Sequence, residues 1–165
     1  MPSVSVAQHA PGRSTTTRLI RAGLVTGLVD GLWACALTLW RHGTILGLWQ
    51  GVASVPFGKG MIGGGTATAL VGIALHFVVA FTWSAVFLLL VLRSPWLRAI
   101  LASPAGVLAV ATVYGPLIWI VMSGIVIPLQ THQPLVITSR WWVQLAGHVL
   151  FVGLPIVATT GNAEG

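Results

Sequence analysis

The sequence predicts an all-α membrane protein, a bundle of four transmembrane helices, and three observations lead to this fold class. Of its 165 residues, 56% are hydrophobic and only 6% are charged, whereas soluble domains carry about 25% charged residues. Four apolar runs have roughly 18 residues or more, the length that a helix needs to cross about 30 Å of hydrocarbon. Basic residues and tryptophans stand at the ends of these runs, where the membrane boundary favours them.

The four spans form one transmembrane domain over residues 19–159, preceded by a polar segment. Residues 1–18 are rich in Ser and Thr and carry two prolines, so they cannot bury enough apolar surface to fold, and we expect a flexible cytoplasmic tail. The third apolar run reaches back to Ala99, but Ser103-Pro104 suits a helix start better than a helix interior. The expected spans cover residues 19–40, 66–92, 104–128 and 141–158.

The basic residues are divided unevenly between the two sides of the bundle. Five lie on the side of the termini: Arg13, Arg18, Arg21, Arg93 and Arg98. Three lie on the other side: Arg41, Lys59 and Arg140. By the positive-inside rule, both termini are expected in the cytoplasm. The net charge of +6 does not predict nucleic-acid binding, because the positive charges form no patch.

The first span also raises the alternative of a cleaved leader. Ala34 and Ala36 resemble a signal-peptidase pattern, and Leu32 to Cys35 resembles a lipoprotein motif. A polar leader of about 20 residues and the acidic Asp30 within the apolar run argue against cleavage, so we expect the span to be retained. Cys35 is the only cysteine, which excludes a disulfide within the chain.

An interfacial amphipathic segment is expected between helices 1 and 2, on the outer side. Apolar residues recur there at helical spacing: Ile45, Leu48, Trp49, Val52 and Val55. The other face is small instead of charged: Gly47, Gln50, Gly51 and Ser54. A helix lying along the membrane surface and a helix partly inserted against the bundle are therefore both open.

Small residues mark the faces on which the helices are expected to pack. Gly23, Gly27 and Gly31 form a GxxxGxxxG face on the first span, and Gly72 belongs to a stripe of small residues on the second. Pro116 lies in the middle of the third span, where it removes a backbone N–H and predicts a kink.

Four polar side chains inside the spans are the candidate functional residues: Asp30, His76, Gln144 and His148. An ionisable group at the bilayer centre costs at least about 2.5 kcal/mol, so such groups face the bundle interior and find partners. Helices 2 and 4 run parallel, and counting from their starts places His76 and His148 at similar depth. We therefore expect the four residues to form an intramembrane polar cluster.

Three roles are open for this cluster. In the first, neutral histidines hydrogen-bond to Asp30, Gln144 or backbone carbonyls and hold the bundle in register, with no cofactor. In the second, His76 and His148 lie diagonally across the bundle and bind a b-type haem between them. In the third, Asp30 and both histidines line a path for protons or a solute. A directly bound metal ion is not expected, because diagonal helices separate the imidazoles too far.

A catalytic role would rest on Ser123, which lies at nearly the depth of His148. A Ser-His pair inside a membrane is typical of rhomboid-type proteolysis. The glycine two residues before the serine is absent, four spans are fewer than that fold uses, and no oxyanion donors are visible. We expect no enzymatic activity and interpret Ser123 as a packing residue.

Four segments together carry a family resemblance: "GLVTGLVDG", "GGGTATALVGIALHFVVAF", "YGPLIWIVMSGIVIPL" and "GHVLFVGLPIV". In this order, the chain resembles over residues 20–158 a group of small four-pass bacterial inner-membrane proteins of the YagU-like type. The resemblance implies a four-helix fold, a bacterial inner-membrane location, an acid at Asp30 and histidines at His76 and His148. It implies no activity.

The function expected from the sequence is that of a structural or accessory membrane component. Its partners would be membrane lipid and either a second copy of the chain or a larger membrane complex. The alternative is a protein that binds a b-type haem, or couples protons to a solute, through His76, His148 and Asp30.

Overall fold

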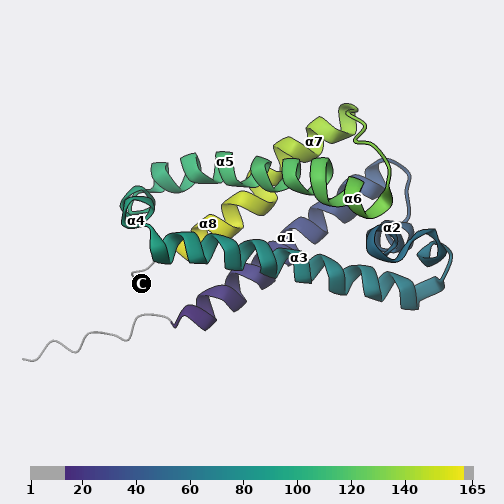
Figure 1. Cartoon of the computed structure of the whole chain (residues 1–165), viewed down its shortest axis with the longest axis horizontal. Coiled ribbons are helices and arrows are strands. Elements are labelled where there is room, and N and C mark those ends of the chain that lie inside the picture. The colour runs from purple at the N-terminus through teal and green to yellow at the C-terminus, as the bar shows by residue number, and fades with distance from the viewer. Residues whose placement is uncertain (1–13, 162–165) are drawn as a thin grey trace, which may run out of the picture.

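Helices make up the protein in the computed structural model, which describes residues 14–161, and the predicted helical-bundle fold class is confirmed (Figure 1). Four helical stretches are long and apolar enough to cross a membrane, so the chain is a multi-pass membrane protein. They are α1 (Thr15–Trp40), α3 (Gly65–Arg93), α5 with α6 (Pro104–Val121 and Ile127–Thr131), and α7 with α8 (Ser139–His148 and Leu154–Gly161). Two shorter helices, α2 (Ile45–Phe57) and α4 (Pro95–Leu101), connect spans.

Hydroxyl side chains fix where several helices begin. Ser14 accepts a hydrogen bond from the backbone N–H of Thr17 and so caps α1. Ser103 accepts one from the N–H of Gly106, and α5 begins at Pro104. Residues 15–18, which we expected in the flexible tail, instead form the first turn of α1; that prediction was wrong because the serine cap stabilises the helix start. The rest of the expected tail, residues 1–13, lies outside the described residues.

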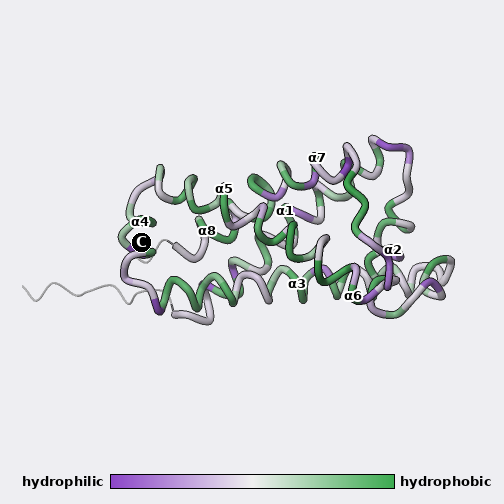
Figure 2. Tube along the Cα trace, turned by 45° about the horizontal axis from the view of Figure 1, so that its top comes forward, coloured by the Kyte–Doolittle hydropathy of each residue, from purple (hydrophilic) through white to green (hydrophobic). Residues whose placement is uncertain are grey.

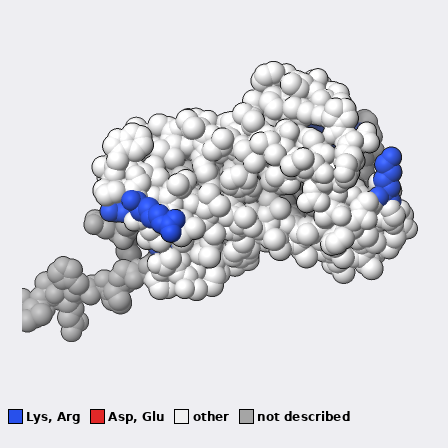
Figure 3. All heavy atoms as spheres, viewed as in Figure 1, with Lys and Arg blue, Asp and Glu red and all other residues white. Residues whose placement is uncertain are grey.

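The start of α1 and the end of α8 lie at the same end of the bundle (Figure 1). The Arg18 guanidinium donates a hydrogen bond to the backbone carbonyl of Thr160, which joins the first and last spans. Hydrophobic residues follow all four spans, while hydrophilic residues gather at the ends and connections (Figure 2). The Lys and Arg side chains in view lie mainly toward the two ends (Figure 3). This distribution is that of a belt facing lipid.

The last span is central to the packing, because α8 contacts α1, α3 and α5. A square up-down bundle would place the second and fourth spans diagonally, but α8 packs directly on α3. The reason is a solid apolar core between α3, α5 and α8 in the half nearest the termini. Its buried members are Phe87, Val91, Leu101, Ala111, Tyr114, Ile118, Val152, Ile156 and Val157.

At the other end, α2 lies across α3 and is viewed nearly along its axis in Figure 1. Its buried residues are Trp49, Gln50 and Ala53, whereas Ile45 is 43% exposed. Of the predicted apolar face, Trp49 is thus buried, and Leu48, Val52 and Val55 are half-buried. The burial of Gln50 was not predicted: its amide donates to the carbonyl of Gly65 and accepts from the N–H of Gly63. These bonds tie α2 to the glycine-rich start of α3.

Two π-helical stretches interrupt the last two spans, and each ends two residues before a proline. Met122–Val126 precedes Pro128, and Val149–Gly153 precedes Pro155. A proline ring collides with the carbonyl four residues earlier in a regular α-helix, and the wider π turn relieves this collision. Helix α5 continues in α-form through Pro116, so the kink expected there stays a prediction.

Candidate functional site: an intramembrane cavity with a polar floor

A cavity of about 870 Å³ occupies the half of the bundle opposite the termini. Exposed residues line one end of it, among them Arg41 and Thr44, and buried residues such as Thr26 and Ile156 line the other. Asp30, His76, Gln144 and His148 all contribute to its wall. The structure thus brings the four predicted polar residues to one cavity that reaches the protein surface.

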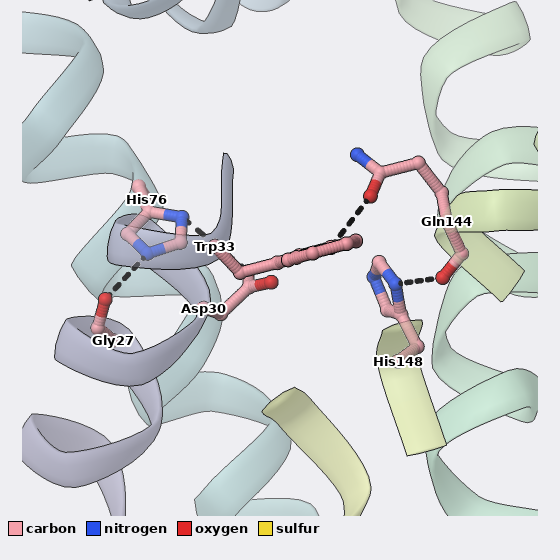
Figure 4. Close-up of polar contacts among 6 residues, drawn as sticks. All are labelled: Gly27, Asp30, Trp33, His76, Gln144 and His148. Atoms are coloured by element: carbon pink, nitrogen blue, oxygen red, sulfur yellow. Dashed lines mark hydrogen bonds and ion pairs between the residues drawn. The ribbon is translucent and has the colours of Figure 1, made fainter. Parts of the chain in front are cut away.

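His76 on α3 is held against α1 (Figure 4). Its Nε2 lies 2.9 Å from the carbonyl oxygen of Gly27, and its Nδ1 lies 3.9 Å from Oδ2 of Asp30. Trp49 of α2 and Phe77 contact the ring edge-on, with centroid distances of 5.3 and 5.7 Å. The imidazole therefore has a fixed orientation, with Nδ1 facing the carboxyl group.

His148 on α7 is held by its own helix. Its Nδ1 lies 2.7 Å from the backbone carbonyl oxygen of Gln144, one turn earlier, and Trp119 packs on the ring at a centroid distance of 4.8 Å. Within residues 14–161, Nε2 of His148 makes no hydrogen bond. His148 is 8% exposed and lines the cavity, so this nitrogen is the one available to a bound molecule.

Trp33 joins α1 to α7 beside the two imidazoles (Figure 4). Its Nε1 donates to Oε1 of Gln144 at 3.0 Å, and its ring stacks on Phe151 at a centroid distance of 4.5 Å. A side chain on Gly147 would collide with the indole. The indole thus determines how closely the first and last spans approach near the site.

The hydrogen bonds fix where protons can be exchanged. A carbonyl oxygen only accepts, so Nε2 of His76 and Nδ1 of His148 each carry a hydrogen. The exchangeable positions are therefore Nδ1 of His76, Nε2 of His148 and the carboxyl group of Asp30. Without a proton between them, the lone pair of Nδ1 of His76 faces a negatively charged oxygen of Asp30. One proton at this position removes that repulsion. It also cancels the single negative charge of the site, and a neutral site is favoured away from bulk water.

Two further polar atoms on the cavity wall are buried without a hydrogen-bond partner in the described part of the chain. They are Oγ1 of Thr26 and Nε1 of Trp119. Thr26 is 1% exposed and lies one helical turn before Asp30. A buried donor without a partner is costly, and such groups at a cavity are explained by a polar molecule that binds there.

The predicted packing glycines of α1 face α3. A side chain on Gly27 would collide with the ring of Phe77. Gly23 meets a second phenyl ring of α3 in the same way, and Gly31 lies against His76. The small-residue face of α1 is therefore filled by the chain's own second span and offers no free surface to a second copy.

The arrangement does not fit a haem bound between two imidazoles. Axial ligation uses a ring nitrogen lone pair, and Nε2 of His76 is committed to Gly27. The remaining Nδ1 faces Asp30 at 3.9 Å, which leaves no room for a haem between them. The haem alternative, with His76 and His148 as its ligands, stays a prediction. In residues 14–161 no group of three or more His, Cys, Asp or Glu is placed to hold a metal ion.

Ser123 lies at the first π-helical stretch and is used structurally. Its hydroxyl donates to the carbonyl of Trp119 at 2.7 Å and accepts from Nε1 of Trp141 at 3.0 Å. Neither partner is a base, so the contacts resemble those of a packing residue and not those of an activated nucleophile.

Sequence reasoning missed the contributions of Trp33, Arg41 and Arg140 to this region. No pattern in the sequence indicated the bond from Trp33 to Gln144. Both arginines were interpreted as topology signals, and they also line the cavity. The available signal was their place at the outer ends of the two spans that carry Asp30 and His148.

No protein-family model matches the chain, and no curated protein or solved structure matches it.

Proposed function

We propose that this chain is a non-enzymatic membrane protein that binds a small solute in its cavity together with an exchangeable proton. The observation that carries the proposal is the placement of Asp30, His76 and His148 on one cavity wall. A cavity of about 870 Å³ lies within the range of small-molecule sites, which are about 300–1,000 Å³. Ionisable groups inside a membrane domain mark proton and solute paths.

The geometry supports a site for a single proton at rest. Nδ1 of His76 and Oδ2 of Asp30 lie 3.9 Å apart, within ion-pair distance, and His148 offers a second position at Nε2. A second proton would leave the site positively charged unless an anion enters with it, and loss of the first would leave it negative. Proton occupancy and solute occupancy are therefore linked, so each changes the affinity for the other by the same factor.

Asp30 is the residue on which this function is tested, because the chain has only two acidic side chains. The purified full-length protein, reconstituted in lipid nanodiscs, is titrated with acid and followed by infrared difference spectroscopy. We expect a carboxylic acid C=O band from a membrane-buried acid, and Asp30→Asn should remove it. Glu164→Gln is the matched control and should leave the band unchanged.

A difference spectrum that is the same in the parent and in Asp30→Asn would contradict the proposal. It would mean that the intramembrane carboxyl group does not exchange its proton with the solvent. The parent and both variants are first compared by gel filtration and circular dichroism, so that a band lost through unfolding is recognised.

The setting of this function is also proposed. Cytoplasmic termini are supported by the distribution of basic residues along the sequence, and a bacterial inner-membrane location is supported by the YagU-like resemblance. The structural or accessory role stays a prediction, as does assembly with a second copy or a larger complex. The cavity favours ligand binding over a purely structural role.

A further inference from the structure

The ionisable side chains on the cavity wall differ between its exposed end and its buried end. They are Asp30 of α1, Arg41 directly after α1, His76 of α3, and Arg140 and His148 of α7, while the lining residues of α2, α5, α6 and α8 carry none. The single acid is paired with a histidine. Both arginines are at the exposed end, so the entrance is positive and the floor is neutral.

The two arginines of the entrance differ from Arg18 and Arg98, two of the four arginines that the structure describes at the other end of the bundle. Arg18 donates to the carbonyl of Thr160, and Arg98 donates to carbonyls at the end of α3. Within residues 14–161, the side chains of Arg41 and Arg140 make no hydrogen bond or ion pair, although both line the cavity. Their guanidinium groups are free to bind a carboxylate, for which their paired N–H donors are well shaped.

The start of α7 adds to this positive potential. Thr138 precedes the helix without a side-chain cap. The amides of Trp141 and Trp142 donate to the carbonyl of Thr138, which leaves those of Ser139 and Arg140 without an acceptor in residues 14–161. Arg140 stands in the same turn. A helix N-terminus with free amides favours an anion, and here it lies next to an unpaired guanidinium on the cavity wall.

The remaining wall suits an apolar or aromatic body. Trp49, Trp83 and Trp119 line the cavity together with aliphatic side chains. At the floor, the unpaired donors of Thr26 and Trp119 and the free Nε2 of His148 lie among these rings. A ligand that fits has one anionic group and a compact apolar body.

We infer that the cavity binds a small organic anion, an aromatic or branched-chain carboxylate, and that each anion is taken up with one proton. The inference rests on the proposed function and names its solute. The carboxylate meets Arg41 and Arg140, and the proton occupies Nε2 of His148, so the charge of anion and proton sums to zero. Neutral uptake avoids a net charge within the membrane domain.

Three probes of one size and shape test the charge of the ligand. Benzoate, benzamide and benzylammonium are titrated calorimetrically into the full-length protein in phosphatidylcholine nanodiscs near neutral pH. Benzoate should bind at least about tenfold more tightly than benzamide, and benzylammonium should bind least tightly. In two buffers of different ionisation enthalpy, benzoate should take up about one proton for each molecule bound.

Variants of the two arginines at the entrance test where the carboxylate of the ligand binds. Arg41→Gln and Arg140→Gln should each weaken benzoate binding by about threefold to tenfold and leave benzamide binding unchanged. Lys59→Gln is the matched control, because Lys59 is a basic residue at the same end that does not line the cavity. Both arginines are exposed, so the variants should fold as the parent does.

Three outcomes would overturn the inference. Benzoate could bind no more tightly than benzamide, the arginine variants could behave like Lys59→Gln, or benzoate could bind without proton uptake. Benzoate binding that is lost in phosphatidylglycerol nanodiscs would assign the arginines to a lipid headgroup and would overturn it as well. The infrared titration of Asp30 tests the proposed function independently of these outcomes.

Discussion

Each imidazole of the site makes its hydrogen bond to a backbone carbonyl and not to a side chain. Gly27 accepts from His76, and Gln144 accepts from His148. A backbone carbonyl does not titrate near neutral pH. It therefore orients the imidazole ring without competing for the exchangeable proton. One nitrogen of each ring is thereby left for the cavity. Rigid orientation and a free ring nitrogen are both needed for a proton-exchanging histidine.

Trp33 and Gln144 should contribute to stability as one unit, because the indole N–H donates to the amide oxygen at 3.0 Å. We expect Trp33→Phe and Gln144→Leu each to lower the free energy of unfolding by about 0.5–1.5 kcal/mol. The double variant should lose clearly less than the sum. Reversible unfolding in mixed micelles measures these free energies. Trp142→Phe is the control, since Trp142 is 58% exposed. Losses that simply add in the double variant would show that Trp33 and Gln144 are not coupled by a hydrogen bond.

The importance of Asp30, His76, Gln144 and His148 could be predicted from the sequence, because polar groups in hydrocarbon need a reason to be there. Their partners could not. Whether His76 meets the carbonyl of Gly27 depends on the rotation of α3 about its axis, which no single-sequence pattern encodes.

Helix α2 forms part of the cavity wall and covers His76 through Trp49. It can lie this close because Gly72 of α3 has no side chain at the point of contact. A Cβ there would collide with the carbonyl oxygen of Trp49. Gln50 then ties the same helix to the turn before α3. Contact with the bundle, and not with the membrane surface alone, holds α2 in place.

Gly72→Ala should therefore lower the free energy of unfolding by about 1–3 kcal/mol, since the added methyl group forces α2 away from α3. Gly51→Ala is the matched control on α2, where an added Cβ meets nothing within 4 Å. It should be neutral or stabilising by up to about 1 kcal/mol, because alanine favours helix. Thermal unfolding in detergent compares the two. Equal melting temperatures would show that this contact is not close in solution.

The positions of the long helices follow from hydrophobicity and length, but their internal irregularities do not. The helical repeat of α2 indicated that Trp49 packs inward, but it did not indicate that the polar Gln50 beside it is buried as well. The π-helical stretches before Pro128 and Pro155 also escape prediction. A proline indicates that the helix must adjust, but not whether it kinks or widens.

The whole bundle is solid near the termini and hollow at the other end. Apolar side chains of α3, α5 and α8 fill the first half, and the cavity with its polar floor occupies the second. The exposed end of the cavity faces the outer side if the termini are cytoplasmic. The solute would then be taken from the outer side, which makes the orientation of the chain decisive for its function.

Reporter fusions should place both termini in the cytoplasm and residues 42–65 outside. The physical reason is the excess of arginine beside the termini and in the connection between α3 and α5. A reporter active only in the cytoplasm is fused after Gly165, after Arg98 and near Lys59. The first two should be active and the third silent. Activity near Lys59 would reverse the orientation and turn the cavity toward the cytoplasm.

The bond from Arg18 to Thr160 has a consequence for how the protein is made. Its two residues are 142 positions apart, and the span that carries Thr160 also supplies Gln144 and His148. During synthesis, the first span waits in the bilayer with Asp30 lacking its full set of neighbours until the last span has been inserted. A ribosome that stops early thus releases a chain with an exposed acid in lipid, a feature by which membrane quality control can recognise an unfinished protein.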